Sequence, residues 1–237
     1  AQVNSDERFR RLFIPSPGLC MVGADLSGIE LRMLAHYLAR YDDGKYADIL
    51  LNGDIHQTNA DKIGISRRQV KTVTYAFLYG AGDEKIGHSF DAQLSTSAAK
   101  RKGKEIRSAY VEAVEGLGKL LEDIKKASEK GSIKAIDGRQ IAVDSSHKAL
   151  NYLLQSGAGV IAKRWMVINQ QHIKELGLCC SQLAFVHDEL QFEVDPEHAN
   201  DLCSSLVLAA TKAGEYYNMR IRIDAEAVQG ENWSTTH

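Results

Sequence analysis

The spacing of apolar residues along the chain predicts strands and helices in succession. Residues 19–26 (LCMVGADL) form a short apolar run of the kind that makes a buried strand. Residues 27–41 follow with apolar side chains at helical spacing, so a helix is expected directly after that strand. In residues 184–194 (AFVHDELQFEV), two apolar stretches meet at an acidic tip, which predicts two strands joined by a tight turn.

Helix-capping residues mark further helices. Asp54 is placed to begin a short helix within GDIHQTNADKIG, and Ser66 to begin a second one that stops at Gly80 and Gly82. The charged region that follows, residues 95–130, is expected to be helical, with breaks near Gly103 and at Gly116–Gly118.

The chain from residue 132 onwards predicts both kinds of element. A hairpin is expected to turn at Asp137–Gly138, and a long helix to run through residues 147–176. A last helix at about 196–217 and a strand at 220–228 (RIRIDAEAV) are expected to follow. The predicted fold class is α/β (α+β), with mainly antiparallel strands and a helical insertion at about 45–130.

The composition excludes few functions. The chain has 237 residues, is 44% hydrophobic and 25% charged, and has a net charge of −2, so contact with nucleic acid would need a local basic patch. Its four cysteines have no metal-type spacing and are expected to be reduced. With neither a leader pattern nor an apolar run of membrane-spanning length, a soluble cytoplasmic protein is expected.

Three carboxylates stand out against this pattern. Side chains alternate faces along a strand, so Asp188 and Glu189 cannot serve one spot unless a turn separates them. Asp25, at the end of the first strand, is the better partner for Asp188, because two aspartates at strand ends make an all-oxygen site suited to Mg²⁺. The alternative is that Asp25 only caps the following helix and the other two are turn residues.

A second candidate site lies on the helix that Ser66 begins. Arg67, Lys71 and Tyr75 are four residues apart, so they drift only about 40° around the helix and rise about 6 Å each. One helix face thus offers two cations and an aromatic ring to a nucleotide, and His56 is a further donor. The alternative is a basic, solvated face with a buried tyrosine. No Walker-type glycine-rich loop accompanies it.

Together these segments resemble those of family A DNA polymerases, the DNA polymerase I family, and are most similar to those of podovirus-type phages. ADLSGIELR resembles motif A, RRQVKTVTYAFLYGAG motif B and FVHDEL motif C. GDIHQTNA, NYLLQSGAG and the ending GENWSTTH match further segments of the family in the same order. The resemblance covers nearly the whole chain.

The resemblance implies a DNA-directed DNA polymerase that extends a primer 3′-hydroxyl, with a role for each matching residue. Asp25, Asp188 and the carbonyl of Leu26 would hold two Mg²⁺ ions about 4 Å apart, a site that Mn²⁺ also fits. Glu189 would have a secondary role near the metals. The residues expected to bind the dNTP are Arg67, Lys71, Tyr75, His56, Glu30 and Tyr79, with Lys71 also donating a proton to pyrophosphate and Glu30 disfavouring ribonucleotides. The residues expected to contact primer–template DNA are Gln155, Asn151, His147, Arg139 and His187.

The resemblance also implies a division of the chain into two parts. Residues 1–44 and 131–237 would form an antiparallel-sheet palm and residues 45–130 the fingers of a right-hand polymerase fold lacking the thumb. Such a chain would act in a phage host's cytoplasm, either alone or with a separate thumb- and exonuclease-bearing polypeptide. Two other readings remain: a single-subunit RNA polymerase, which Glu30, Tyr75 and the Asp188–Glu189 pair argue against, and a nucleotide- or DNA-binding accessory chain.

Overall fold

The structure, a computed structural model, describes residues 6–237 and divides into two compact units. The first unit contains the chain up to Ile29 together with Ala158–His237, and the second contains Glu30–Gly157. The first unit lies within the predicted palm, residues 1–44 and 131–237. The second unit contains the predicted fingers, residues 45–130, together with flanking residues on both sides. The assignment of the two units as palm and fingers stays a prediction.

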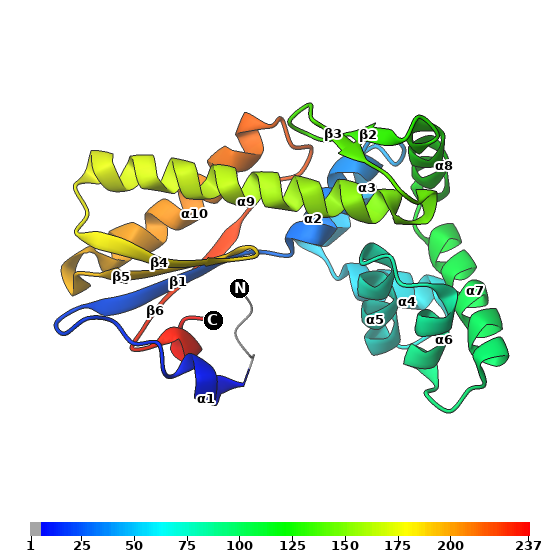
Figure 1. The fold of residues 1–237 in the computed structure, drawn as a ribbon, viewed down its shortest axis with the longest axis horizontal. Helices are drawn as coiled ribbons and strands as arrows, with labels where there is room; N and C mark the ends of the chain where they lie inside the picture. The colour runs from blue at the N-terminus through cyan, green and yellow to red at the C-terminus, as the bar shows by residue number, and fades with distance from the viewer. Residues whose placement is uncertain (1–5) are drawn as a thin grey trace. The chain divides into compact units, whose positions relative to one another are not determined.

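The first unit is built on a four-stranded antiparallel sheet (Figure 1). Its strands lie in the order β4-β5-β1-β6, so β1 pairs with β5 on one side and with β6 on the other. Their bounds are β1 Cys20–Leu26, β4 Cys180–Val186, β5 Glu189–Val194 and β6 Ala225–Gly230. This mixture of helices with an antiparallel sheet confirms the predicted fold class, and β1, β4 and β5 confirm the strands expected there.

Different parts of the chain pack on the two faces of this sheet. Val22 and Leu26 of β1 point to the face on which α10 (Ala199–Tyr216) packs, and both are almost fully buried. α9 (Ala149–Leu176) lies beside α10, and the Trp165 indole of α9 donates to the Leu206 carbonyl of α10 at 2.8 Å. On the opposite face, Gly23 lies against Thr236 of the C-terminal segment. That face also carries Asp25, because alternate residues of a strand share a face.

Three short elements complete the first unit. α1 (Glu7–Arg10) contacts the 3₁₀ turn η3 (Trp233–Thr235), and the Phe13 ring meets the Trp233 ring edge-on at 5.1 Å. A second 3₁₀ turn, η2 (Pro196–His198), leads into α10. The expected helix at 196–217 is confirmed as η2 followed by α10.

The last strand differs from the prediction. Residues 220–228 were expected to be a strand, but β6 begins only at Ala225 and continues to Gly230. Ala225 pairs with Leu26, the last residue of β1, so the residues before it have no strand to pair with. Ile221 and Ile223 are buried instead, and Ile223 lies against Gly214 of α10, which explains the alternating pattern without a strand.

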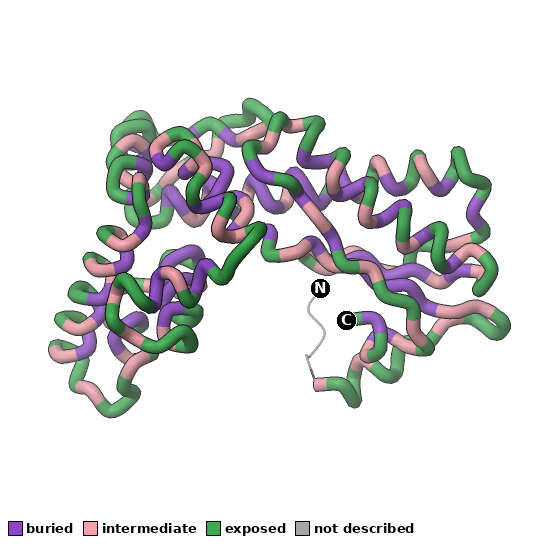
Figure 2. The backbone as a smooth tube through the Cα atoms, turned by 180° about the vertical axis from the view of Figure 1, so that it is seen from behind, coloured by how far each residue is buried: buried purple, intermediate pink, exposed green. Residues whose placement is uncertain are grey.

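The second unit is mostly helical, with buried positions along the inner sides of its helices (Figure 2). A two-stranded hairpin turns at Gly138, which has a φ of +87°, as expected for this Asp–Gly turn. The elements are α2 Ile29–Leu38, α3 Lys45–Asn52, α4 Ile55–Ile63, α5 Arg67–Leu78, α6 Asp83–Phe90, α7 Thr96–Ala113, α8 Leu117–Ser128, β2 Ser132–Lys134, β3 Gln140–Ala142, η1 Ser146–Lys148 and the part of α9 up to Gly157.

The predicted break near Gly103 is wrong, because α7 runs unbroken from Thr96 to Ala113. A Cβ at Gly103 would lie 2.6 Å from the carbonyl carbon of Asp83, at the start of α6. The glycine therefore permits close helix contact rather than ending the helix. The second predicted break is confirmed, since α8 begins at Leu117 after Gly116, whose φ is +81°.

The described residues contain no helix that is long and apolar enough to cross a membrane. The four cysteines are free thiols, as expected from their spacing.

Candidate functional site

In the first unit, the end of β1 lies beside the tip of the β4–β5 hairpin. His187 and Asp188 form the turn of this hairpin, and Glu189 is the first residue of β5. The backbone N–H of Leu26 donates to the Asp188 carbonyl at 3.1 Å. Asp25 and Asp188, far apart in sequence, are thus carried by neighbouring backbone. Asp188 lies within the turn itself, and Glu189 follows it directly as the start of β5.

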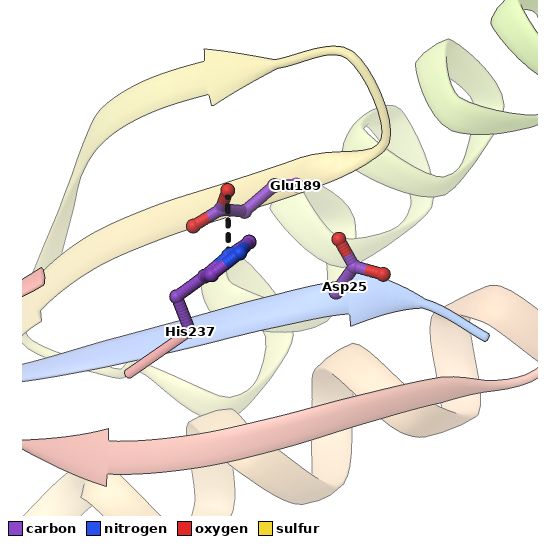
Figure 3. A group of neighbouring side chains, drawn as sticks. All are labelled: Asp25, Glu189 and His237. Carbon is purple, nitrogen blue, oxygen red and sulfur yellow. Dashed lines mark ion pairs between the residues drawn. The ribbon is translucent and has the colours of Figure 1, made fainter. Parts of the chain in front are cut away.

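Glu189 is the most enclosed of the three carboxylates. Its side chain is 6% exposed, and it lies opposite Asp25 in the β1–β5 register. One carboxylate oxygen, Oε1, accepts from the Gln191 amide at 2.7 Å and from the Trp233 indole. The other, Oε2, lies 3.1 Å from Nδ1 of His237 (Figure 3).

Three of these side chains converge on one face of the sheet (Figure 3). Asp25, Glu189 and His237 each offer a ligand atom, and those atoms lie within 4.8 Å of one another. Asp188 is not one of the three. Glu226 of β6 is the other strand neighbour of Asp25, so three acidic residues stand in one row across β5, β1 and β6. Like charges on adjacent strands destabilise a sheet, and a bound cation would offset this repulsion.

In the second unit, α5 carries the predicted column of cations. Ser66 and Gln69 form a reciprocal capping box, which explains why the helix begins where the sequence predicted. Arg67 is exposed, and its Nε lies 2.7 Å from Oδ2 of Asp54, the residue that caps α4. Lys71 is exposed as well and makes no ion pair with any residue the structure describes. Two cations are therefore presented along one exposed face of α5.

Aromatic side chains extend this column. Tyr75 is partly buried, and its ring centroid lies 6.2 Å from that of His56 and 6.4 Å from that of Tyr79. Burial lowers the pKa of His56 from its ordinary 6.5, and the charges of Arg67 and Lys71 lower it further, whereas Asp54 acts in the opposite direction. His56 is thereby biased towards the neutral imidazole.

The C-terminal end of α5 is held by two side chains. The Tyr79 hydroxyl donates to Oε1 of Glu30 at 2.8 Å, so the two residues expected near the sugar and the base pair contact each other. The side-chain amide of Asn151 donates to the Leu78 carbonyl at 2.8 Å, which satisfies a carbonyl that the helix end leaves unpaired. Asn151, expected at the DNA, thus also has a structural contact.

The remaining predicted DNA contacts lie at the surface. Gln155 of α9 and His147 of η1 are exposed. Arg139 is exposed too, and its Nε bonds Asp137 within the β2–β3 turn. His187 is an exposed turn residue in the left-handed conformation, with a φ of +57°.

Sequence reasoning missed the residues that surround Glu189. Gln191, Trp233 and His237 all contact its carboxylate, yet none was given a role. The available signal was the segment GENWSTTH, which was matched to the family as a whole without roles for its side chains.

The comparisons with known proteins identify the class to which this fold and these motifs belong. The model of DNA polymerase family A matches residues 2–235, and the chain belongs to that family.

Individual relatives agree with this assignment. The chain is 36% identical over 241 residues to the DNA-directed DNA polymerase of Enterobacteria phage T3, covering 91% of this chain and 33% of that protein. It is also 36% identical, over 238 residues, to that of Escherichia phage T7, with the same shares. DNA polymerase I of Pseudomonas aeruginosa is 25% identical over 97% of this chain and 26% of its own length.

A solved structure shows the same fold. The POL domain of Pol1 from M. smegmatis, in complex with DNA primer-template and dNTP, superposes with a TM-score of 0.80 at 25% identity. The match covers 100% of this chain and 44% of that one. The chain spans about a third of the length of its phage relatives.

Proposed function

We propose that this chain is the catalytic part of a DNA-directed DNA polymerase, which adds deoxynucleotides to the 3′-hydroxyl of a primer. The observation that carries the proposal is the placement of Asp25 beside the hairpin tip of Asp188, within a chain of family A. The likeness to a polymerase domain bound to primer-template DNA and dNTP supports these substrates.

The donors at this place fit Mg²⁺. Asp25 and Asp188 supply carboxylates and Leu26 a carbonyl, and Mg²⁺ prefers such oxygen ligands together with substrate phosphates. When bound, a pair of Mg²⁺ ions stabilises the attacking and leaving oxygens of an in-line displacement. The proposed part of Asp25 and Asp188 is to hold these ions, and Glu189 supports them from its buried position.

The second unit supplies the proposed nucleotide contacts. Arg67 and Lys71 are exposed cations one turn apart on α5, which suits the outer phosphates of a triphosphate. His56 is biased towards the neutral form and offers a hydrogen bond rather than a fixed charge. Tyr75 presents a ring to the sugar and base. The further role proposed for Lys71 is to donate a proton as pyrophosphate leaves.

Other residues have proposed roles in selecting and guiding substrates. The role proposed for Glu30, which accepts a hydrogen bond from the Tyr79 hydroxyl, is to disfavour a ribose 2′-hydroxyl. Four residues of the second unit are proposed to contact primer–template DNA: the partly buried Asn151 and the exposed Gln155, His147 and Arg139, with His187 of the first unit beside the primer end.

Primer extension by an Asp188→Asn variant tests the proposal. Asparagine keeps the shape of the turn residue but removes the charge, so extension should fall by at least about 100-fold, the loss typical of removing one charge-stabilising group. Asp201→Asn, an exposed change on α10, is the matched control and should extend primers like the original chain. Full extension by Asp188→Asn with an unchanged circular dichroism spectrum would refute the assignment.

A second candidate function is a subunit that works only with a thumb-bearing polypeptide. The segment before β1 favours it, because Leu12 is 75% exposed and Ile14 is 69% exposed, next to Phe9 and Phe13. Exposed apolar residues gathered in one segment mark protein contacts. Assays of the chain alone, and then mixed with the exonuclease- and thumb-bearing part of a phage relative, separate the two candidates. Extension that appears only in the mixture supports the second.

A further inference from the structure

The group formed by Asp25, Glu189 and His237 differs chemically from the oxygen donors proposed for Mg²⁺. It adds an imidazole nitrogen to two carboxylates, and its ligand atoms lie within 4.8 Å of one another. Two ligands on a tetrahedral Zn²⁺, with bonds of about 2.1 Å, lie roughly 3.4 Å apart. The 3.1 Å separation between His237 and Glu189 is close to that spacing.

The surroundings of Glu189 resemble those of a metal ligand. Oε1 accepts from Gln191 and Trp233, which fixes the carboxylate, while Oε2 faces His237. Outer hydrogen bonds of this kind orient carboxylates that bind metals. The acid is 95% buried, with a relative exposure of 5%, so its orientation is set by the fold rather than by solvent.

The backbone brings His237 to this place. A Cβ at Gly23 would collide with the Thr236 carbonyl and with the Gln191 side chain, so a glycine is needed where the C-terminal segment crosses β1. Thr236 also donates from its hydroxyl to Oε1 of Gln191 at 2.8 Å. The His237 side chain remains 40% exposed, which leaves a path for an ion from solvent.

We propose that Asp25, Glu189 and His237 bind Zn²⁺, with a solvent molecule as the fourth ligand. Imidazole suits Zn²⁺, whereas Mg²⁺ selects oxygen ligands and keeps most of its water. Since Asp25 also belongs to the proposed Mg²⁺ site, Zn²⁺ bound here competes with Mg²⁺ for that carboxylate. This consequence rests on the proposed polymerase function, but the binding of Zn²⁺ does not. The site would make primer extension sensitive to free Zn²⁺.

Calorimetric titration of the full chain with ZnCl₂ tests the binding. His237→Ala should weaken Zn²⁺ binding by at least about tenfold, because the loss of a mere outer partner already costs 10- to 100-fold. His237→Cys should restore it, since a thiolate also binds Zn²⁺. His88→Ala, a change in α6 of the second unit, is the matched control and should leave the affinity unchanged.

Co²⁺ titration adds a spectroscopic readout. Replacement of Zn²⁺ by Co²⁺ should give the visible bands of a four-coordinate site with nitrogen and oxygen ligands, and His237→Ala should lose them. Sulfur-to-cobalt charge-transfer bands would point to Cys179 or Cys180 instead and would overturn the assignment. Equal Zn²⁺ affinity in His237→Ala and the original chain would also overturn it.

Primer extension in Mg²⁺ with added ZnCl₂ separates this inference from the proposed function. The Zn²⁺ concentration that halves extension should rise at least about tenfold in His237→Ala, in line with the loss of affinity. Zn²⁺ binding that depends on His237 in a chain without extension would refute the function alone. Extension with Zn²⁺ binding independent of His237 would refute the inference alone.

Discussion

The contact between α6 and α7 makes Gly103 the most informative position for a stability test. An alanine Cβ there would lie 2.6 Å from the carbonyl carbon and 3.0 Å from the Cα of Asp83, and the carbonyl oxygen would be closer still. These are backbone atoms, so no side-chain rotation relieves the clash. Overpacking costs about 1–3 kcal/mol, and replacing glycine by alanine within a helix returns about 1 kcal/mol. We expect Gly103→Ala to lower the free energy of unfolding by about 2 kcal/mol, near the upper end of that difference.

Gly159→Ala is the matched control, because Gly159 lies inside α9 and a Cβ there meets no atom within 4 Å. The same substitution should therefore stabilise the chain by up to about 1 kcal/mol. Urea unfolding followed by circular dichroism at 222 nm measures both. With a typical urea slope of about 2 kcal/mol per molar, the midpoint should fall by roughly 1 M in Gly103→Ala and rise by up to about 0.5 M in Gly159→Ala.

Tryptophan fluorescence makes this test more specific. Both tryptophans, Trp165 and Trp233, belong to the first unit, whereas Gly103 belongs to the second. If the units unfold separately, Gly103→Ala shifts the circular dichroism transition and leaves the fluorescence transition unchanged. A Gly103→Ala chain as stable as the original would refute the argument that this glycine permits close packing.

Two predictions concern His56 and Lys71, which are among the proposed nucleotide contacts. NMR titration should give His56 a pKa below 6.5, and Arg67→Gln should raise it, since burial and then Arg67 lower it. The unfolded chain binds this proton more readily than the folded chain does. The contribution of neutral His56 to the free energy of unfolding is therefore complete above pH 6.5 and falls as the pH drops towards the folded pKa. A His56 pKa that does not change in Arg67→Gln would contradict this electrostatic account. Lys71→Ala should lower kcat/KM for dNTP by about 10- to 100-fold, the equivalent of the 1.5–3 kcal/mol of a hydrogen bond to a charged group. Arg101→Ala, which removes an exposed cation on α7 of the same unit, should have little effect, and equal losses in steady-state assays would contradict a specific role for Lys71.

Much of the candidate site was predictable because its signals are local. Ser66 and Gln69 stand three residues apart and form the capping box that begins α5. The start of the helix in turn determines the side of α5 on which Lys71 and Tyr75 lie. The acidic interruption at residues 188–189 likewise predicted the β4–β5 turn. Capping and hairpin formation depend on residues a few positions apart, so the sequence displays them directly.

Other features depend on segments that meet only in the folded chain. A glycine such as Gly103 is typical of a helix break, but here α6 packs against it and α7 continues through it. Ile221 and Ile223 alternate like a strand, but β1 has already ended at Leu26, and α10 covers them instead.

The sequence by itself determined the motifs, the helix that carries the cations, and the family to which they belong. Only the tertiary structure decided the surroundings of Glu189. His237 lies 48 positions further along the chain, and neither periodicity nor capping relates two residues so far apart. Their contact arises because the C-terminal segment crosses β1 at Gly23, where the absence of a side chain leaves room for the backbone of Thr236.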